Sequence, residues 1–127
     1  LLEKLKYTPM LNGKRRGISS YYDNELSFID EIKLTKTDPG SSRHLYVIRV
    51  KNRDKLARYL KKNNIPIQFH YPYSLNTFKP FGIKNKKIKL HNSEKWAREC
   101  ISLPLHPLMP INEAKHVVNL LKKYFRY

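Results

Sequence analysis

The sequence is poor in cysteine and acidic residues and has no long apolar run, and each shortage excludes a class of protein. Its single cysteine, Cys100, rules out an internal disulfide framework and fits the reducing cytoplasm, where we expect the protein to act. One cysteine and five scattered histidines lack the spacing of a structural zinc site, so no metal is expected. No apolar run reaches the roughly 18 residues that a membrane-spanning helix needs. The first residues also lack the order of a secretory signal.

Positive charge is the largest imbalance in the composition. Lysine and arginine number 26 against 10 acidic residues, which gives a net charge of +16. Such a charge supports polyanion binding, and nine tyrosines and five phenylalanines could stack on bases, so a stand-alone nucleic-acid-binding module is one hypothesis. Against it, the basic residues are spread along the chain and form no known binding motif. Abundant lysine, asparagine and isoleucine, whose codons are AT-rich, offer a second explanation in the base composition of the genome.

The 127 residues are about one domain's worth of sequence. The expected elements of the first half are a helix over 12–28, a short strand over 29–34, a turn over 37–42 and a buried strand over 44–50. The turn follows from its Pro-Gly-Ser chemistry, and the strand after it from β-branched and aromatic residues.

The second half of the chain continues with alternating elements and one long loop. The expected elements are a helix over 52–62 closed by Asn63 and Asn64, a strand over 65–69, a loop over 70–92 that ends in a lysine cluster at 84–89, a helix capped by Ser93 with Cys100 on its apolar face, a strand over 101–105, and a final amphipathic helix from Pro110. The order predicts an α+β fold with a small, mostly antiparallel sheet and helices packed on one face.

Four segments together resemble a known family. They are similar, in the same order along the chain, to segments of the DegT/DnrJ-type sugar aminotransferases: the stretch from Lys14 to Asp23, His44–Val50 (HLYVIRV), Ile65–Pro72 (IPIQFHYP) and Ile101–Pro107 (ISLPLHP). The resemblance covers nearly the whole chain. It implies the carboxy-terminal small domain of a fold-type I enzyme, with residues 1–28 as a linker helix that leaves a large domain and residues 29–127 as the small domain.

The resemblance also implies a chemistry that this chain does not complete. Family members transfer an amino group from glutamate to a nucleotide-linked keto sugar, with pyridoxal phosphate held as a Schiff base on a lysine of the large domain. None of the 18 lysines here matches that position. We therefore expect no catalytic or cofactor-binding residue on this chain, pyridoxal phosphate only in the complete enzyme, and a partner large domain, with a homodimer in complete relatives. A third hypothesis is an inactive remnant of a split gene.

By the resemblance, the end of the strand before the long loop faces the sugar nucleotide. His70 and Tyr71 lie there, and an imidazole and a phenol can hydrogen-bond sugar hydroxyls or phosphate. Tyr73, Asn76 and His44 complete the predicted substrate-binding set. Two structural alternatives stay open: His70 caps its own strand while Tyr71 packs, and His44 makes a structural hydrogen bond at the start of its strand.

Overall fold

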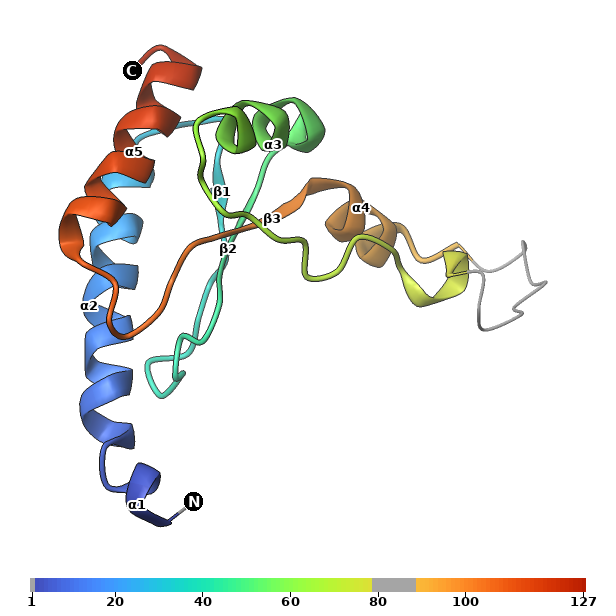
Figure 1. The fold of residues 1–127 in the computed structure, drawn as a ribbon. Helices are drawn as coiled ribbons and strands as arrows, with labels where there is room; N and C mark the ends of the chain where they lie inside the picture. The colour runs from blue at the N-terminus through green and yellow to red at the C-terminus, as the bar shows by residue number, and fades with distance from the viewer. Residues whose placement is uncertain (1, 79–88) are drawn as a thin grey trace.

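The fold was analysed in a computed structural model, which describes residues 2–78 and 89–127. Its elements are α1 (Leu2–Leu5), α2 (Thr8–Leu26), β1 (Lys33–Leu34), β2 (Tyr46–Arg49), α3 (Arg53–Lys62), the 3-10 helix η1 (Leu75–Thr77), α4 (His91–Glu99), β3 (Cys100–Leu103) and α5 (Ile111–Phe125) (Figure 1). The predicted α+β class with an antiparallel sheet is confirmed. In the described part of the chain, no helix is long and apolar enough to cross a membrane.

The long helix α2 joins the amino-terminal segment to the core. It begins at Thr8, earlier than predicted, because Pro9 fits the first helical turn, where its missing N–H needs no partner. It ends at Leu26 and buries Ile18, Tyr22 and Leu26, which are four residues apart and so share one face. That face packs on α5 (Figure 1). Helix α2 therefore shares the hydrophobic core of the rest of the domain. The boundary between a linker helix over 1–28 and a small domain over 29–127 stays a prediction.

The sheet has three strands in the order β1-β2-β3, and both pairings are antiparallel. All four predicted strands are shorter than expected, and two of them differ most. The segment 29–34 pairs only at Lys33 and Leu34, because Ile29 and Ile32 are buried in turns before them. The segment 65–69 is not a regular strand: it contains Pro66, which has no N–H to donate, and it pairs with β3 only through Gln68 and Ser102.

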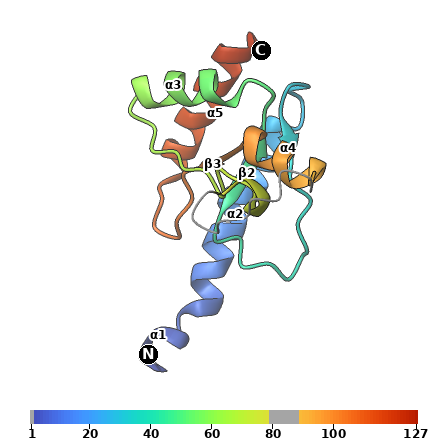
Figure 2. The same ribbon diagram turned by 90° about the vertical axis from the view of Figure 1, so that its right-hand side faces the viewer.

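The two faces of the sheet have different neighbours. Tyr46 and Ile48 of β2 point toward the main core, where the Tyr46 ring lies 4.8 Å from that of Tyr22 on α2. Arg49 points to the opposite face and lies over Trp96 of α4. Figure 1 shows α2 and α5 on one side of the sheet and α4 on the other, and in Figure 2, where the right-hand side of Figure 1 faces the viewer, α4 lies toward the viewer. Helix α4 therefore covers a face that the main core leaves open.

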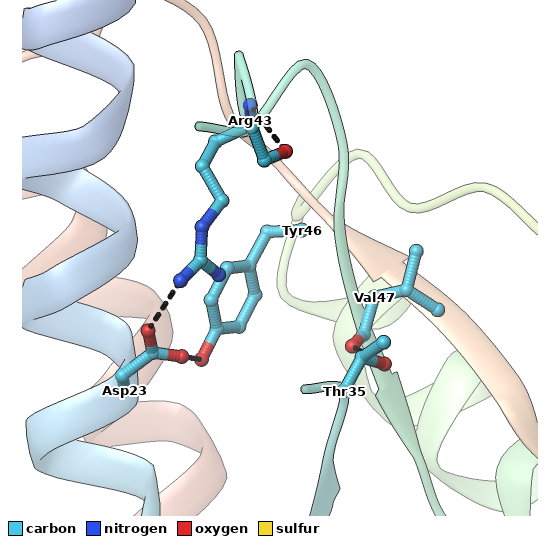
Figure 3. Close-up of polar contacts among 6 residues, drawn as sticks. Asp23, Thr35, Arg43, Tyr46 and Val47 are labelled. Atoms are coloured by element: carbon cyan, nitrogen blue, oxygen red, sulfur yellow. Dashed lines mark hydrogen bonds and ion pairs between the residues drawn. The ribbon is translucent and has the colours of Figure 1, made fainter. Parts of the chain in front are cut away.

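A polar cluster fastens α2 to the loop before β2 (Figure 3). Asp23 accepts a hydrogen bond of 2.7 Å from the Tyr46 hydroxyl and forms an ion pair of 3.3 Å with Arg43. The Tyr22 hydroxyl donates to the Pro104 carbonyl at 3.1 Å. Burial raises the pKa of both tyrosines, and for Tyr46 the hydrogen bond to Asp23 raises it further. Both hydroxyls are therefore protonated donors over the physiological pH range.

The end of α3 lies where the sequence predicts it, whereas both ends of α4 differ from the prediction. Asn64 has a φ of 59°, the left-handed conformation predicted for the end of the 52–62 helix. Helix α4 begins at His91 instead of at Ser93, and the Glu94 carboxylate accepts the Leu90 N–H at 3.1 Å. Cys100 is buried as predicted but opens β3 instead of lying on the helix.

The closing helix is the element that the sequence pattern predicts best. Helix α5 begins just after Pro110 and buries Ala114, Val117, Val118 and Leu121 on one face. Its other predicted apolar residues, Tyr124 and Phe125, pack against the core from the edge. Of the predicted lysine cluster, only Lys89 is described, and it is exposed; Lys84, Lys86 and Lys87 lie outside the described residues.

Candidate functional site

A groove of about 450 Å³ lies between the segment that follows Phe69 and helix α4. Its lining consists of His70, Tyr71, Tyr73, Ser74, Leu75, Leu90, Asn92, Ser93, Trp96 and Ala97. Three of the five residues predicted to bind substrate therefore share one groove, and α4 forms its opposite wall.

Side chains of α4 and β3 hold the groove wall that is formed by the segment after Phe69. The Trp96 indole Nε1 donates to the His70 carbonyl at 3.1 Å, and the His70 Nδ1 lies 2.8 Å from the Ser102 Oγ. The Cys100 thiol donates to the Tyr71 carbonyl at 3.6 Å, and burial raises the pKa of this thiol, which keeps the proton available. Contacts from α4 and β3 thus hold the backbone at His70 and Tyr71 in place.

The aromatic side chains of that wall are left open to solvent. Tyr71 is 72% exposed and Tyr73 is 63% exposed. The Tyr73 ring stacks on Phe78 at 6.0 Å, while the His70 ring meets Tyr71 edge-on at 5.7 Å. Ring faces of this kind are available to a ligand, whereas the backbone that presents them is anchored.

Asn76 and His44, also predicted to bind substrate, do not line the groove. The Asn76 amide donates to the Glu94 carboxylate at 2.8 Å, and this bond lowers the pKa of Glu94. Asn76 therefore links η1 to α4. His44 is exposed in the loop before β2. Binding of substrate by either residue stays a prediction.

Trp96 is the largest of the groove residues that the sequence did not reveal. Its helix was predicted, and a tryptophan beside Ala97 and Cys100 is typical of a buried apolar face. The structure places Trp96 at the groove wall, with the Arg49 guanidinium 5.6 Å from its ring centre. Arg49 in turn pairs with Glu99 at 2.8 Å. The one signal in the sequence is that this is the chain's single tryptophan.

The lining of the groove does not fit pyridoxal phosphate. Among the described residues that line it, there is no lysine for a Schiff base, no carboxylate for the pyridine nitrogen and no arginine or lysine for the phosphate. A Schiff-base lysine is normally held away from water. Among the described lysines, only Lys122 is not classed as exposed, and it pairs with Glu25 at 2.6 Å.

Two further grooves lie elsewhere on the described surface. One, of about 590 Å³, lies between the end of α3 and the start of α5 over Ile65, Met109 and Val117. The other, of about 450 Å³, contains Lys33, Lys51 and Lys95 together with acidic residues. Within residues 2–78 and 89–127, no group of three or more histidine, cysteine or acidic side chains could hold a metal ion.

Comparison with known proteins gives consistent matches over nearly the whole chain. A family model described as the DegT/DnrJ/EryC1/StrS aminotransferase family matches residues 1–122. The erythromycin biosynthesis sensory transduction protein EryC1 of Saccharopolyspora erythraea is 31% identical, over 94% of this chain and 33% of its own. The dTDP-3-amino-3,6-dideoxy-alpha-D-galactopyranose transaminase of Aneurinibacillus thermoaerophilus is 32% identical, over 95% of this chain and 33% of its own.

The fold matches solved structures over the same span. The crystal structure of Streptomyces venezuelae DesV in complex with a ketimine intermediate superimposes with a TM-score of 0.90 and 25% sequence identity, over 97% of this chain and 34% of that one. Helicobacter pylori PseC, with a TM-score of 0.86 and 24% identity, has the same fold over 98% of this chain. The chain thus spans about a third of the length of the relatives that it matches.

Proposed function

Because the chain belongs to the DegT/DnrJ/EryC1/StrS aminotransferase family, we propose that it supplies the carboxy-terminal domain of an aminotransferase acting on a nucleotide-linked keto sugar. The observation that supports this most strongly is the match over residues 1–122, which agrees in extent with the superposition on DesV. Matched relatives include transaminases of dTDP- and UDP-linked sugars. Polysaccharide or O-antigen biosynthesis in the cytoplasm is the setting that we propose for this reaction.

In this proposal the groove at α4 is the chain's contribution to substrate binding. His70 and Tyr71 have the hydrogen-bonding groups that a sugar nucleotide needs, and Trp96 and Cys100 fix their backbone. A fixed backbone with open side chains is the arrangement that a binding site needs, since little order has to be gained when the ligand arrives.

The amino-group chemistry belongs, in this proposal, to a second and larger domain. Pyridoxal phosphate, when bound there, supplies the electron sink for transamination. The described residues that line the groove include no fitting lysine, carboxylate or phosphate-binding cation, which supports this division. The partners that we propose are therefore the large domain, on the same or another chain, glutamate as amino donor, and a second copy of the complete enzyme.

The two other hypotheses have less support. No specific observation favours nucleic acid, because exposed basic residues occur on α1, α2, α3, α4 and α5 and not on a single face. The inactive-remnant hypothesis does not explain why side-chain hydrogen bonds still hold the walls of the groove in place.

Titration of the purified chain with pyridoxal phosphate tests whether the cofactor site lies on another domain, as we propose. We expect no saturable aldimine absorbance at one cofactor per chain after gel filtration, since exposed lysines react only weakly and without preference. The complete A. thermoaerophilus transaminase, treated in the same way, is the positive control. A stoichiometric aldimine on this chain would show that the Schiff-base lysine lies here and that the proposed division is wrong.

A further inference from the structure

We propose that the groove between residues 70–75 and α4 receives the nucleobase of the nucleotide-linked sugar, with Trp96, Tyr71 and Tyr73 as its stacking surfaces. The proposal rests on the proposed function, which it deepens by assigning one part of the substrate to this groove. It also gives Trp96 a role in binding that the sequence pattern did not indicate.

The charge of the lining limits which part of the substrate can enter. None of its ten residues is lysine, arginine, aspartate or glutamate. A diphosphate held against these ten described residues would find none of the cationic partners that phosphate recognition uses. The groove therefore fits an uncharged ring, which leaves the base or the sugar.

The aromatic side chains favour the base over the sugar. Four rings line the groove, those of His70, Tyr71, Tyr73 and Trp96, and the exposed tyrosines present faces on which a planar base can stack. The volume of about 450 Å³ lies within the range of small-ligand pockets and leaves room for a base.

Polar groups at the rim can recognise the edge of a base. Asn92 and Ser93 of the first turn of α4 line the groove, and both are exposed. In the described part of the chain their side chains make no hydrogen bond, so the Asn92 amide and the Ser93 hydroxyl are available. An amide offers both a donor and an acceptor, which is what the edge of a base presents in return.

The tryptophan is held in a fixed orientation. Its Nε1 donates to the His70 carbonyl, and Arg49, fixed by Glu99, lies over its ring. Arg49 and Glu99 are therefore positioning residues for Trp96. A ring fixed in advance loses little rotational freedom on binding, which favours stacking.

Intrinsic fluorescence can report on this groove directly, because Trp96 is the chain's only tryptophan. The 127-residue chain is titrated with thymidine, uridine and guanosine, and in parallel with glucose and with inorganic pyrophosphate, after correction for absorption by the nucleosides. We expect saturable quenching by at least one nucleoside, with little dependence on salt because the described residues of the lining carry no fixed charge. Calorimetry of the same titrations detects binding that leaves the fluorescence unchanged.

A pair of tyrosine variants locates the binding. Tyr73→Ala removes an exposed stacking surface, and we expect it to weaken nucleoside binding about 5- to 150-fold. Tyr7→Ala, at a residue that is 56% exposed and lies between α1 and α2, is the matched control and should leave binding unchanged. Trp96 emission in the absence of ligand checks that each variant is folded.

Several outcomes would overturn the proposal. They are binding of glucose or pyrophosphate without nucleoside, nucleoside binding that Tyr73→Ala leaves unchanged, and no binding by either method. Failure of the proposed function is a separate result: nucleosides would then bind, but a cofactor-loaded enzyme that contains this chain would not transaminate. If nucleosides do not bind but a cofactor-loaded enzyme that contains this chain does transaminate, only the nucleobase assignment is refuted.

Discussion

Alkaline pH should destabilise the domain through its buried tyrosine hydroxyls. Tyr46 is 4% exposed, and both burial and its hydrogen bond to Asp23 raise its pKa. In the unfolded chain a tyrosine has a pKa of about 10. A group whose pKa is raised by folding contributes stability that is complete below the unfolded pKa and is lost as the pH rises above it.

The size of the effect follows from proton linkage. Above pH 10 the unfolded chain releases the Tyr46 proton while the folded chain retains it, so the free energy of unfolding falls by about 1.4 kcal/mol per pH unit. Between pH 9 and pH 11 the loss due to this hydroxyl is about 1.4 kcal/mol. Tyr22, which is fully buried and has a raised pKa, adds a similar loss.

Urea denaturation at a series of pH values, followed by circular dichroism, measures this loss in the wild type and in Tyr46→Phe. The variant is less stable at neutral pH because Asp23 loses a donor, yet it should lose about 1.4 kcal/mol less than the wild type between pH 9 and pH 11. Tyr7→Phe, at an exposed position, should keep the wild-type pH dependence. Equal pH dependence in wild type and Tyr46→Phe would refute the buried-donor account.

Three other substitutions test the packing and the ion pairs by urea denaturation at neutral pH. Leu121→Ala, at a fully buried position, should lower the free energy of unfolding by about 2–5 kcal/mol, and a loss below 1 kcal/mol would contradict the core assignment. Ser19→Ala should raise it by about 1 kcal/mol, because the buried Ser19 hydroxyl has no partner within the described residues; any loss of stability would argue against this. Glu99→Gln, which disrupts the partly buried pair with Arg49, should lower the free energy of unfolding by about 1–3 kcal/mol. Glu3→Gln, at the surface, should lower it by less than about 0.5 kcal/mol. Equal losses in the two variants would show that burial of the ion pair does not affect its contribution.

Sequence reasoning succeeded where the determining interactions are local. The α5 stripe follows from apolar residues at helical spacing, and the left-handed Asn64 follows from the residue preference of helix ends. It failed at the segment 65–69, whose apolar residues suggested a strand. Its only pairing is between Gln68 and Ser102, and no local pattern predicts an interaction between residues so far apart.

The candidate site was predicted in part for the same reason. His70, Tyr71 and Tyr73 lie in one segment, so a motif could locate them together. The opposite wall comes from α4, and Trp96 reaches the groove only because β3 returns the chain beneath His70. Asn76 lies in the same segment, but its amide is directed to Glu94, a contact that follows from the packing of η1 on α4.

The most direct test of the proposed function is a chimeric enzyme. In it, the third of the A. thermoaerophilus transaminase that this chain matches is replaced by the chain, and transamination of that enzyme's own substrate is measured. We expect a cofactor-loaded, active chimera whose kcat/KM falls at least about tenfold when His70→Ala and Tyr71→Ala are combined, because two contacts to the substrate are lost. A folded, cofactor-loaded chimera without turnover, or one that the double substitution leaves unaffected, would contradict the proposal.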